Sequence, residues 1–407
     1  MLTRRESAGY PQFLGGSARA VDTLITDSSE PDSAAESRGH RTAFVLRGLT
    51  AMPISWGSPG CDTEHMLGGL AATRSQLTRL AGRPVEAAEF SHEVSAALKR
   101  TLPFDGWCLI GIAPDTGLRT AQFSGRGTDQ TAEMSRNEAL MPDVNKYQDL
   151  AVAEVPVGWL SREHPAARHS FRLNEILLPL GFHSEVRVVL REHGRLWGAL
   201  VLFRESPLPA FNDADTATLC ALAEPLTSAM RAYPVRGLDR RGAAPGAGVV
   251  ALAPDNRLVA VTSEAQQWLD DLVPGGEDET NAGDITRVLF DAAHAVRRAD
   301  AGRASTCIRT VSGHWLRVEG TAMTIGPADV AVLLHRATPR ELLGTFADHH
   351  GLSARESEIF SLLVDGLASK QIARELAISL LTVNGHLGSL YRKVDVSGRE
   401  ELFGRLA

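Results

Sequence analysis

The amino-acid sequence predicts a multidomain α+β protein, in which two mixed α/β parts precede an all-α module of four helices. Three observations predict this order. Alternating β-rich runs form a hairpin at residues 184–204, further strand-like runs fill residues 248–336, and short amphipathic helices with capping residues fill residues 351–407. The chain has 407 residues, enough for two or three domains of about 100–200 residues each.

The composition restricts the classes of function. The formal net charge is −7 at pH 7, so any contact with nucleic acid must come from a local basic patch. No lysine follows a glycine, which excludes a GxxxxGK[ST] phosphate loop. The four cysteines form no CxxC pair and no metal-ligand spacing, which indicates reduced thiols. No apolar run approaches the roughly 20 residues of a membrane span, so we expect a cytoplasmic protein without a membrane partner.

Residues 1–75 are rich in Ser, Gly, Arg and Asp, as in the stretch DSSEPDSAAESRGH, and show neither helical nor strand periodicity. Such a segment cannot bury enough apolar surface to offset the entropy lost on ordering. We therefore predict that residues 1–75 are disordered and that order begins near Pro84.

Residues 76–235 form the first predicted domain, with a helix, a strand pair, a hairpin and a helix in that order. The hairpin turns at His193 and Gly194, Asn212 caps the last helix, and residues 125–170 are polar and irregular. The runs GFHSEVRVVLREHGRLWGALVLFRE and PAFNDADTATLCALAEPL resemble a GAF domain. The resemblance implies a sensory domain with a pocket over its sheet for a small-molecule effector. A pocket that only packs, or that pairs with a partner protein, is the alternative.

Residues 236–340 contain a linker rich in Gly, Pro and Arg, followed by a second set of elements. A strand, a turn at Asp255 and Asn256, a strand, a helix and three more strands follow one another. This order resembles a PAS domain. His294, His314 and His335 are isolated in the sequence, so each is expected to be a surface or core histidine. We predict no metal and no cofactor such as haem or flavin.

Capping signals divide residues 341–407 into four helices. Ser353 and Glu356 form a capping box, and Gly366 ends the helix that follows. Ser379 caps the third helix, and a second capping box, from Ser397 to Glu400, opens the fourth. Two short helices joined by a tight turn make a helix-turn-helix, although periodicity alone leaves a plain four-helix bundle open.

The run LSARESEIFSLLVDGLASKQIARELAISLLTVNGHLGSLYRKVDVSGREEL is similar to the LuxR/FixJ-type DNA-binding domain along its full length. With the GAF-like part, the chain resembles large bacterial LuxR-type regulators. The matching residues are Leu352, Arg355, Glu356, Gly366, Ile372, Ala373, Leu376, Ile378, Ser379, Thr382, Val383, His386, Leu387, Lys393 and Arg399.

This resemblance implies that the helix over residues 380–394 enters the major groove of double-stranded DNA. It also implies a homodimer, and RNA polymerase is a further candidate partner. The candidate DNA-binding residues are Lys370, Ser379, Thr382, Asn384, Gly385, His386, Gly388, Arg392 and Lys393. The candidate dimer contacts, on the last helix, are Leu402, Phe403 and Leu406.

The third helix departs from the family pattern at Asn384 and Gly388, where relatives often carry lysine or another long polar residue. Gly385 and Gly388 offer no side chain, and each costs the helix about 1 kcal/mol relative to alanine. In residues 351–407 the Arg and Lys residues equal the Asp and Glu residues in number. We therefore predict weak, dimer-dependent DNA binding with strong salt sensitivity.

The sequence as a whole predicts a transcription regulator in which N-terminal sensory domains control a C-terminal helix-turn-helix. The alternative is a protein-interaction or effector-binding module whose helix-turn-helix has lost DNA binding. An enzyme is disfavoured because there is no GxSxG motif, and because His164 and His169 lack the glutamate of an HExxH motif.

Overall fold

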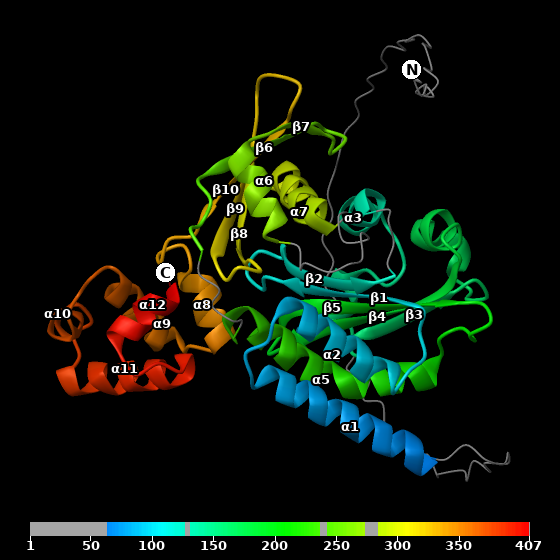
Figure 1. Cartoon of the computed structure of the whole chain (residues 1–407), viewed down its shortest axis with the longest axis horizontal. Helices are drawn as coiled ribbons and strands as arrows, with labels where there is room; N and C mark the ends of the chain where they lie inside the picture. Colours follow the sequence, from blue (N-terminus) through cyan, green and yellow to red (C-terminus); the bar gives the residue numbers. More distant parts are fainter. Residues whose placement is uncertain (1–62, 127–130, 237–241, 273–283, 407) are drawn as a thin grey trace, which may run out of the picture. The chain divides into compact units, whose positions relative to one another are not determined.

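The computed structural model describes residues 63–126, 131–236, 242–272 and 284–406. Residues 61–407 form one compact unit, shown in Figure 1. Its two antiparallel sheets with helices, followed by a helical C-terminal module, confirm the predicted multidomain α+β fold class.

The predicted disordered segment needs one correction, because helix α1 (Thr63–Ala81) includes residues 63–75. The helix is held by tertiary contacts rather than by a regular apolar face. Leu77 is fully buried, and the Thr73 hydroxyl donates a hydrogen bond of 3.0 Å to the carbonyl of Ala97. Residues 1–62 of that predicted segment lie outside the described residues.

The first sheet has the strand order β2-β1-β5-β4-β3, and every neighbouring pair is antiparallel. The predicted hairpin is confirmed as β4 and β5, joined at His193 and Gly194, both with positive φ. Such a two-residue turn matches the natural twist of the strands. The five strands are β1 (Gly106–Ile112), β2 (Arg119–Gly125), β3 (Val157–Ser161), β4 (Phe182–Glu192) and β5 (Arg195–Glu205).

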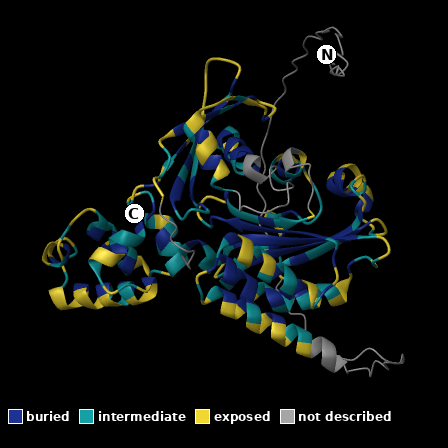
Figure 2. Ribbon diagram, in the orientation of Figure 1, coloured by how far each residue is buried: buried dark blue, intermediate teal, exposed yellow. Residues whose placement is uncertain are grey.

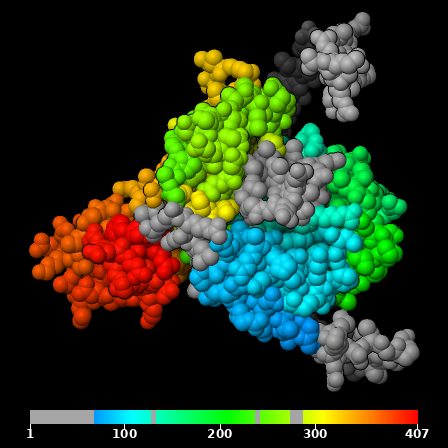
Figure 3. Space-filling view, viewed as in Figure 1, coloured from blue at the N-terminus to red at the C-terminus, as the bar shows by residue number. Residues whose placement is uncertain are grey.

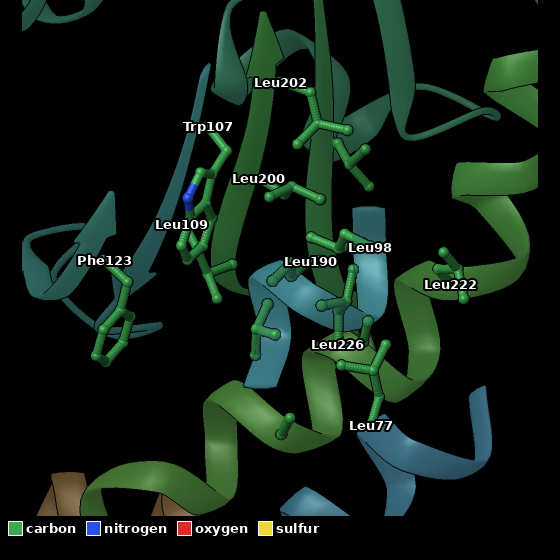
Figure 4. Close-up of a cluster of buried hydrophobic side chains, with 14 of the residues drawn as sticks. Leu77, Leu98, Trp107, Leu109, Phe123, Leu190, Leu200, Leu202, Leu222 and Leu226 are labelled. Atoms are coloured by element: carbon green, nitrogen blue, oxygen red, sulfur yellow. The ribbon is translucent and has the colours of Figure 1, made fainter. Parts of the chain in front are cut away.

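One face of this sheet packs on helices α2 (Ala87–Lys99) and α5 (Asp213–Arg236). Figure 4 shows the core between them, where Leu109 and Leu200 from the sheet meet Leu226 from α5. The predicted cap of α5 is present, since the Asn212 side-chain oxygen accepts hydrogen bonds from two backbone amides of the first turn.

The segment that the sequence left irregular carries several short elements. They are α3 (Thr131–Leu140), α4 (Tyr147–Val152), β3 and a 3-10 turn at Ala167–His169, and a π-helical turn at Arg172–Leu177 follows directly. Buried charges hold this segment to strand β4: Arg172 Nε lies 2.8 Å from Glu185 Oε1, and both side chains are fully buried. Ion pairs of this kind leave no periodic signal in a sequence, so the pattern could not predict them.

The second sheet has the strand order β7-β6-β10-β9-β8, again all antiparallel. Helices α6 (Ser263–Asp270) and α7 (Asp284–Arg298) bury Trp268 and Leu289 in its core. The strands and α6 follow the predicted order, whereas helix α7, between α6 and β8, was not predicted. The PAS-like resemblance stays a prediction. The strands are β6 (Gly248–Leu252), β7 (Leu258–Val261), β8 (Arg303–Arg309), β9 (Trp315–Ala322) and β10 (Val330–Arg336).

Helix α8 (Leu343–His350) precedes the C-terminal module and was not predicted. His349, near the end of this helix, contacts the first domain. The His349 ring lies 5.2 Å from the Trp197 ring, and its Nδ1 lies 2.7 Å from the carbonyl oxygen of Arg231. Burial lowers the pKa of His349, so this side chain is neutral at pH 7.

The C-terminal module has the four predicted helices (orange to red in Figure 3). They are α9 (Ala354–Val364), α10 (Ser369–Glu375), α11 (Leu380–Val394) and α12 (Arg399–Leu406). Ser353 and Glu356 form the predicted capping box. At the start of α12, however, the Ser397 amide and hydroxyl bind Glu401 rather than Glu400, so the predicted second box is replaced by a contact one residue later.

Replacing Arg172 with alanine should lower the free energy of unfolding of the first domain by about 3–5 kcal/mol, because Glu185 would remain buried without its main cation. Urea denaturation followed by tryptophan fluorescence measures this loss. The exposed Arg162 in the same segment provides the control, and its change to alanine should cost less than about 0.5 kcal/mol. Equal losses in both variants would contradict the role given to the buried pair.

Candidate nucleic-acid interface

Helix α11 begins at a tight turn in which Ala377 has a φ of 51°. The Ser379 hydroxyl accepts a hydrogen bond of 3.0 Å from the Thr382 amide, which caps the helix as predicted. The hydroxyls of Ser379 and Thr382 also lie 2.8 Å apart, and both residues are exposed. These two predicted DNA-binding residues therefore stand together at the exposed N-terminus of α11, where a backbone phosphate is favoured.

The inner face of α11 fixes the orientation of the helix. Val383, Leu387, Leu390 and Val394 are buried against α9 and α10, in the same core as Ile372. Burying such a stripe stabilises one rotation of the helix about its axis. The opposite face is consequently set toward solvent (yellow in Figure 2).

The outer face carries the residues that the sequence predicted for it. Asn384, Gly385, Gly388 and Arg392 are all exposed, and His386 is half-buried at the edge of this face. Leu381 is 82% exposed, an unusual position for a large apolar side chain. The structure thus brings most of the predicted DNA-binding residues of α11 onto one accessible surface, which we call the outer face.

Gly385 and Gly388 have no steric role in the packing of the domain. A Cβ atom built at either position would meet no atom within 4 Å, among the neighbours outside the turns of its own helix. Alanine would fit at both positions and would favour the helix by about 1 kcal/mol each. The reason for glycine therefore lies outside the internal packing of this chain.

Lys393 makes contacts that the sequence did not predict. Its Nζ lies 2.6 Å from Glu356 Oε2 and 2.8 Å from the carbonyl oxygen of Gly351, so the ammonium ties α11 to the start of α9. Burial alone would raise the pKa of Glu356, but the bonds from Lys393 and from the capping Ser353 outweigh it and lower that pKa to about 2. The ammonium of Lys393 therefore already binds a carboxylate and a carbonyl oxygen of the same domain.

Other cations of the module also serve its architecture. Arg399 donates to the carbonyl oxygens of Leu363 and Leu367 at the end of α9, and Arg405 donates to that of Asp395. Arg355 pairs with Glu358 at 2.5 Å. Although the module has equal numbers of opposite charges, several of its cations are therefore already engaged in contacts within the module.

Arg392 is an exposed cation on the outer face, and Lys370 and Arg374 are exposed on the neighbouring helix α10. Lys370 and Arg374 stand four residues apart, and neither side chain has a hydrogen-bond or ion-pair partner among the described residues. Arg392 makes one side-chain bond, of 3.3 Å, to the Ser389 hydroxyl. The candidate residues chosen from the sequence did not include Arg374, although its i+4 spacing from Lys370 would have placed it there.

The predicted dimer contacts on α12 do not share one environment. Leu402 and Leu406 are buried in the core of the module, whereas Phe403 is only half-buried, with its ring 5.5 Å from the Arg399 guanidinium. Of these three, Phe403 is the side chain that a second subunit could reach without unfolding the helix.

Other kinds of site find little support in the described part of the chain. No group of three or more His, Cys, Asp or Glu residues there could hold a metal ion. Likewise, none of the helices described is long and apolar enough to span a membrane.

Two family models match the chain. Residues 350–405 match the model described as bacterial regulatory proteins, luxR family, and residues 86–230 match the GAF domain. The first match covers helices α9–α11 and most of α12, and the second covers the first sheet with α2 and nearly all of α5. The two models therefore fall on separate parts of the chain, the helical module and the first domain.

Individual proteins resemble the C-terminal part. The spore germination protein GerE of Bacillus subtilis is 44% identical over 50 residues, 12% of this chain and 68% of GerE. The monoamine regulon transcriptional regulator of Klebsiella aerogenes is 44% identical over 54 residues, 13% of this chain and 24% of that protein. YhjB of Escherichia coli is 36% identical over 88 residues, 21% of this chain and 42% of YhjB.

The chain thus spans less than half of the length of two of these relatives. Among solved structures, Escherichia coli SdiA aligns over 82% of this chain and 95% of its own, with 16% identity and a TM-score of 0.27.

The low pKa of Glu356 predicts an acid-sensitive helix-turn-helix. A carboxylate whose folded pKa lies below its unfolded value of about 4.5 adds stability above that pH and loses it as the pH falls toward 2. Relative to Glu356→Gln, the wild type should gain on the order of 2–3 kcal/mol at pH 6 and almost nothing near pH 2. Hydrogen exchange of α9 and α11, compared between variants at each pH, measures this difference. The exposed Glu358→Gln serves as control, and a pH-independent difference would refute the assignment.

Proposed function

Because the chain belongs to the luxR family of bacterial regulatory proteins, we propose that it is a transcription regulator that binds double-stranded DNA through helix α11. We further propose that the GAF domain senses a small-molecule effector and controls this binding. The observation that carries the proposal is the exposed outer face of α11, flanked by the free cations Lys370 and Arg374. Phosphate neutralisation by such cations supplies much of the affinity of a protein for DNA.

In this proposal the exposed polar residues divide into two roles. Ser379, Thr382, Lys370 and Arg374 contact phosphates and set the register of the helix on the duplex. Asn384 can pair with adenine through two hydrogen bonds, and Arg392 is placed to contact a base or a phosphate. Lys393 is exposed as well, and its ammonium also pairs with Glu356 at the start of α9.

The two glycines give the outer face a distinct shape. Because Gly385 and Gly388 lack side chains, the backbone of α11 can approach the edges of the bases more closely at their positions. Fewer side chains also mean fewer base contacts, so one copy of the module should recognise little sequence. A homodimer, with Phe403 of α12 at its contact, would double the phosphate and base contacts.

A regulator of this kind works where the DNA is, so we propose a cytoplasmic location and contact with RNA polymerase at the promoter. No catalytic activity is part of the proposal. Two of the relatives reported above are named as transcriptional regulators, YhjB and the monoamine regulon transcriptional regulator.

A second candidate function rests on Leu381. An apolar side chain that is 82% exposed on the outer face is suited to a protein partner. In that case the helix-turn-helix would serve as an interaction module that has lost DNA binding.

Salt dependence separates the two candidates. In fluorescence anisotropy with duplex DNA from upstream of the gene, the wild type should bind at low salt and weaken steeply as salt rises. The double change Lys370→Ala and Arg374→Ala should reduce the slope of log K against log salt by about 2, at about 1 per lost phosphate contact. Arg340→Ala, at an exposed cation paired with Asp365, is the control and should leave the slope unchanged. Absence of binding at low salt by a dimeric sample would favour the interaction module.

Base recognition should depend on Asn384. Changing it to alanine should reduce discrimination between the preferred site and a site altered at one adenine by about 1–3 kcal/mol. Affinity for unrelated DNA should change little, because phosphate contacts remain. Competition binding with the two duplexes measures this discrimination, and the exposed Glu375→Gln variant on α10 is the control for a general change of surface charge. An unaltered site preference would remove Asn384 from the interface.

A further inference from the structure

Leu381 stands at one end of a stripe that runs along the outer face of α11. Leu381, Gly385, Gly388 and Arg392 are spaced i, i+4, i+7 and i+11, so they follow one another along the same side of the helix. All four are exposed, and their side of the helix lies opposite the buried inner face. The stripe therefore has an apolar side chain at its N-terminal end, two positions without side chains in the middle, and a cation at its C-terminal end.

A single exposed leucine is ordinary on a protein surface and by itself indicates no partner. Leu381 is informative because of its place. It directly precedes Thr382 and follows Ser379 by two residues, and these are the residues assigned above to a phosphate at the start of α11. A recognition helix of a helix-turn-helix meets base edges with its N-terminal residues. A duplex bound at α11 would therefore cover the Leu381 side chain.

The surface beside Leu381 is open. Gly385, about one turn further along the stripe, has no side chain, and a Cβ atom built on it would meet no side chain within 4 Å beyond its immediate neighbours in the chain. The Leu381 side chain thus does not fold back over Gly385. Glycine also lets the backbone come close to a bound molecule. A small group on a base therefore fits beside the leucine and over the backbone of the helix.

The chemistry of the major groove determines which group suits this place. Base edges there carry hydrogen-bond donors and acceptors, and the C5 methyl of thymine is their apolar group. Leucine laid over a donor or an acceptor would leave that group without a partner, which costs free energy. Leucine laid over a methyl group releases water from two apolar surfaces, which is favourable. An apolar side chain at position 381 consequently favours thymine over the other bases.

The surroundings of Leu381 suit a duplex better than a protein partner. Within residues 351–406, the other large apolar side chain that is exposed is Leu380, at 37%, so the apolar surface is small. Lys370 and Arg374 are exposed on the neighbouring helix α10, and a third cation ends the stripe. Cations around a small apolar group are complementary to phosphates on either side of a methyl group.

We propose that Leu381 is a specificity-determining residue, which packs on the C5 methyl of a thymine in the major groove beside the open surface of Gly385. The proposal rests on the proposed DNA binding by α11 and adds a base that the helix selects without a hydrogen bond. Cβ atoms three residues apart on a helix are separated by about 5–6 Å, which is less than two base-pair steps of about 3.4 Å each. This thymine therefore lies within about two base pairs of the adenine assigned to Asn384.

Deoxyuridine tests the contact, because it lacks the C5 methyl of thymidine and keeps every hydrogen-bonding group. Fluorescence anisotropy compares binding of the full-length protein to the upstream duplex with its thymines intact and with all of them replaced by deoxyuridine. The wild type should bind the deoxyuridine duplex about fourfold more weakly for each methyl contact. Leu381→Ala should bind the two duplexes within about 1.5-fold of each other. Ile325→Ala, at an 86% exposed apolar residue of the second domain, is the matched control and should show the wild-type loss.

Single replacements then locate the methyl group. When thymines are replaced one at a time, the loss should be confined to one or two base pairs of each half-site, next to the position that depends on Asn384. An equal loss in the wild type and in Leu381→Ala would overturn the proposal, since it would come from the shape of the duplex. A loss spread evenly over all the thymines would overturn it as well.

The same measurements separate this proposal from the function on which it rests. Equal binding of both duplexes by the wild type would overturn the methyl contact and leave DNA binding by α11 in place. Absence of binding to either duplex at low salt, by a dimeric sample, would overturn both and would leave Leu381 to the protein partner of an interaction module.

Discussion

The buried pair of Arg172 and Glu185 is the constraint on which the first domain depends. The guanidinium also donates to Asn137 and to the carbonyl oxygen of Val144, so most of its donors are satisfied without water. An ionised pair without exposure is tolerated only if its partners stand at fixed places, because leaving either charge alone costs several kcal/mol. Because the hydrogen-bond partners of this pair lie among the short elements between β2 and β4, the pair holds those elements over the sheet. Those elements include α3 and α4, which line part of a cavity of about 820 Å³ beside the first sheet.

The basic residues of the helix-turn-helix have two different roles. Lys393 and Arg399 complete the domain by binding a carboxylate and the last carbonyls of α9, whereas Lys370 and Arg374 remain in solvent. Formal neutrality is therefore compatible with a positive surface beside α11. The same division explains how the module can be rigid without a large core, since its cations fasten helix ends that would otherwise fray.

Periodic elements could be predicted from the sequence, and elements held by tertiary contacts could not. The hairpin at residues 184–204 and the capped helices of the C-terminal module carry local signals, and they are present. Helices α1 and α8 are held by contacts such as Thr73 with Ala97 and His349 with Trp197, which no local pattern reveals. The exposed face of α11 could be predicted from the positions of its buried apolar residues. Sequence spacing could not show that Lys393 contacts Glu356. The cavity lined by Ile110 and His294 could not be predicted from the sequence, because its walls join residues almost two hundred positions apart.

The hydrogen-bonded chain from Asp329 through Arg297 and Asn256 fixes the tautomer of His294. Two bonds to Asp329 hold Arg297, which can only donate, so the Asn256 side-chain oxygen faces it and the Asn256 amide nitrogen donates to His294 Nε2. Burial lowers the pKa of His294, which favours the neutral imidazole with its proton on Nδ1. Three side chains from separate elements thereby orient one buried ring without placing a charge on it.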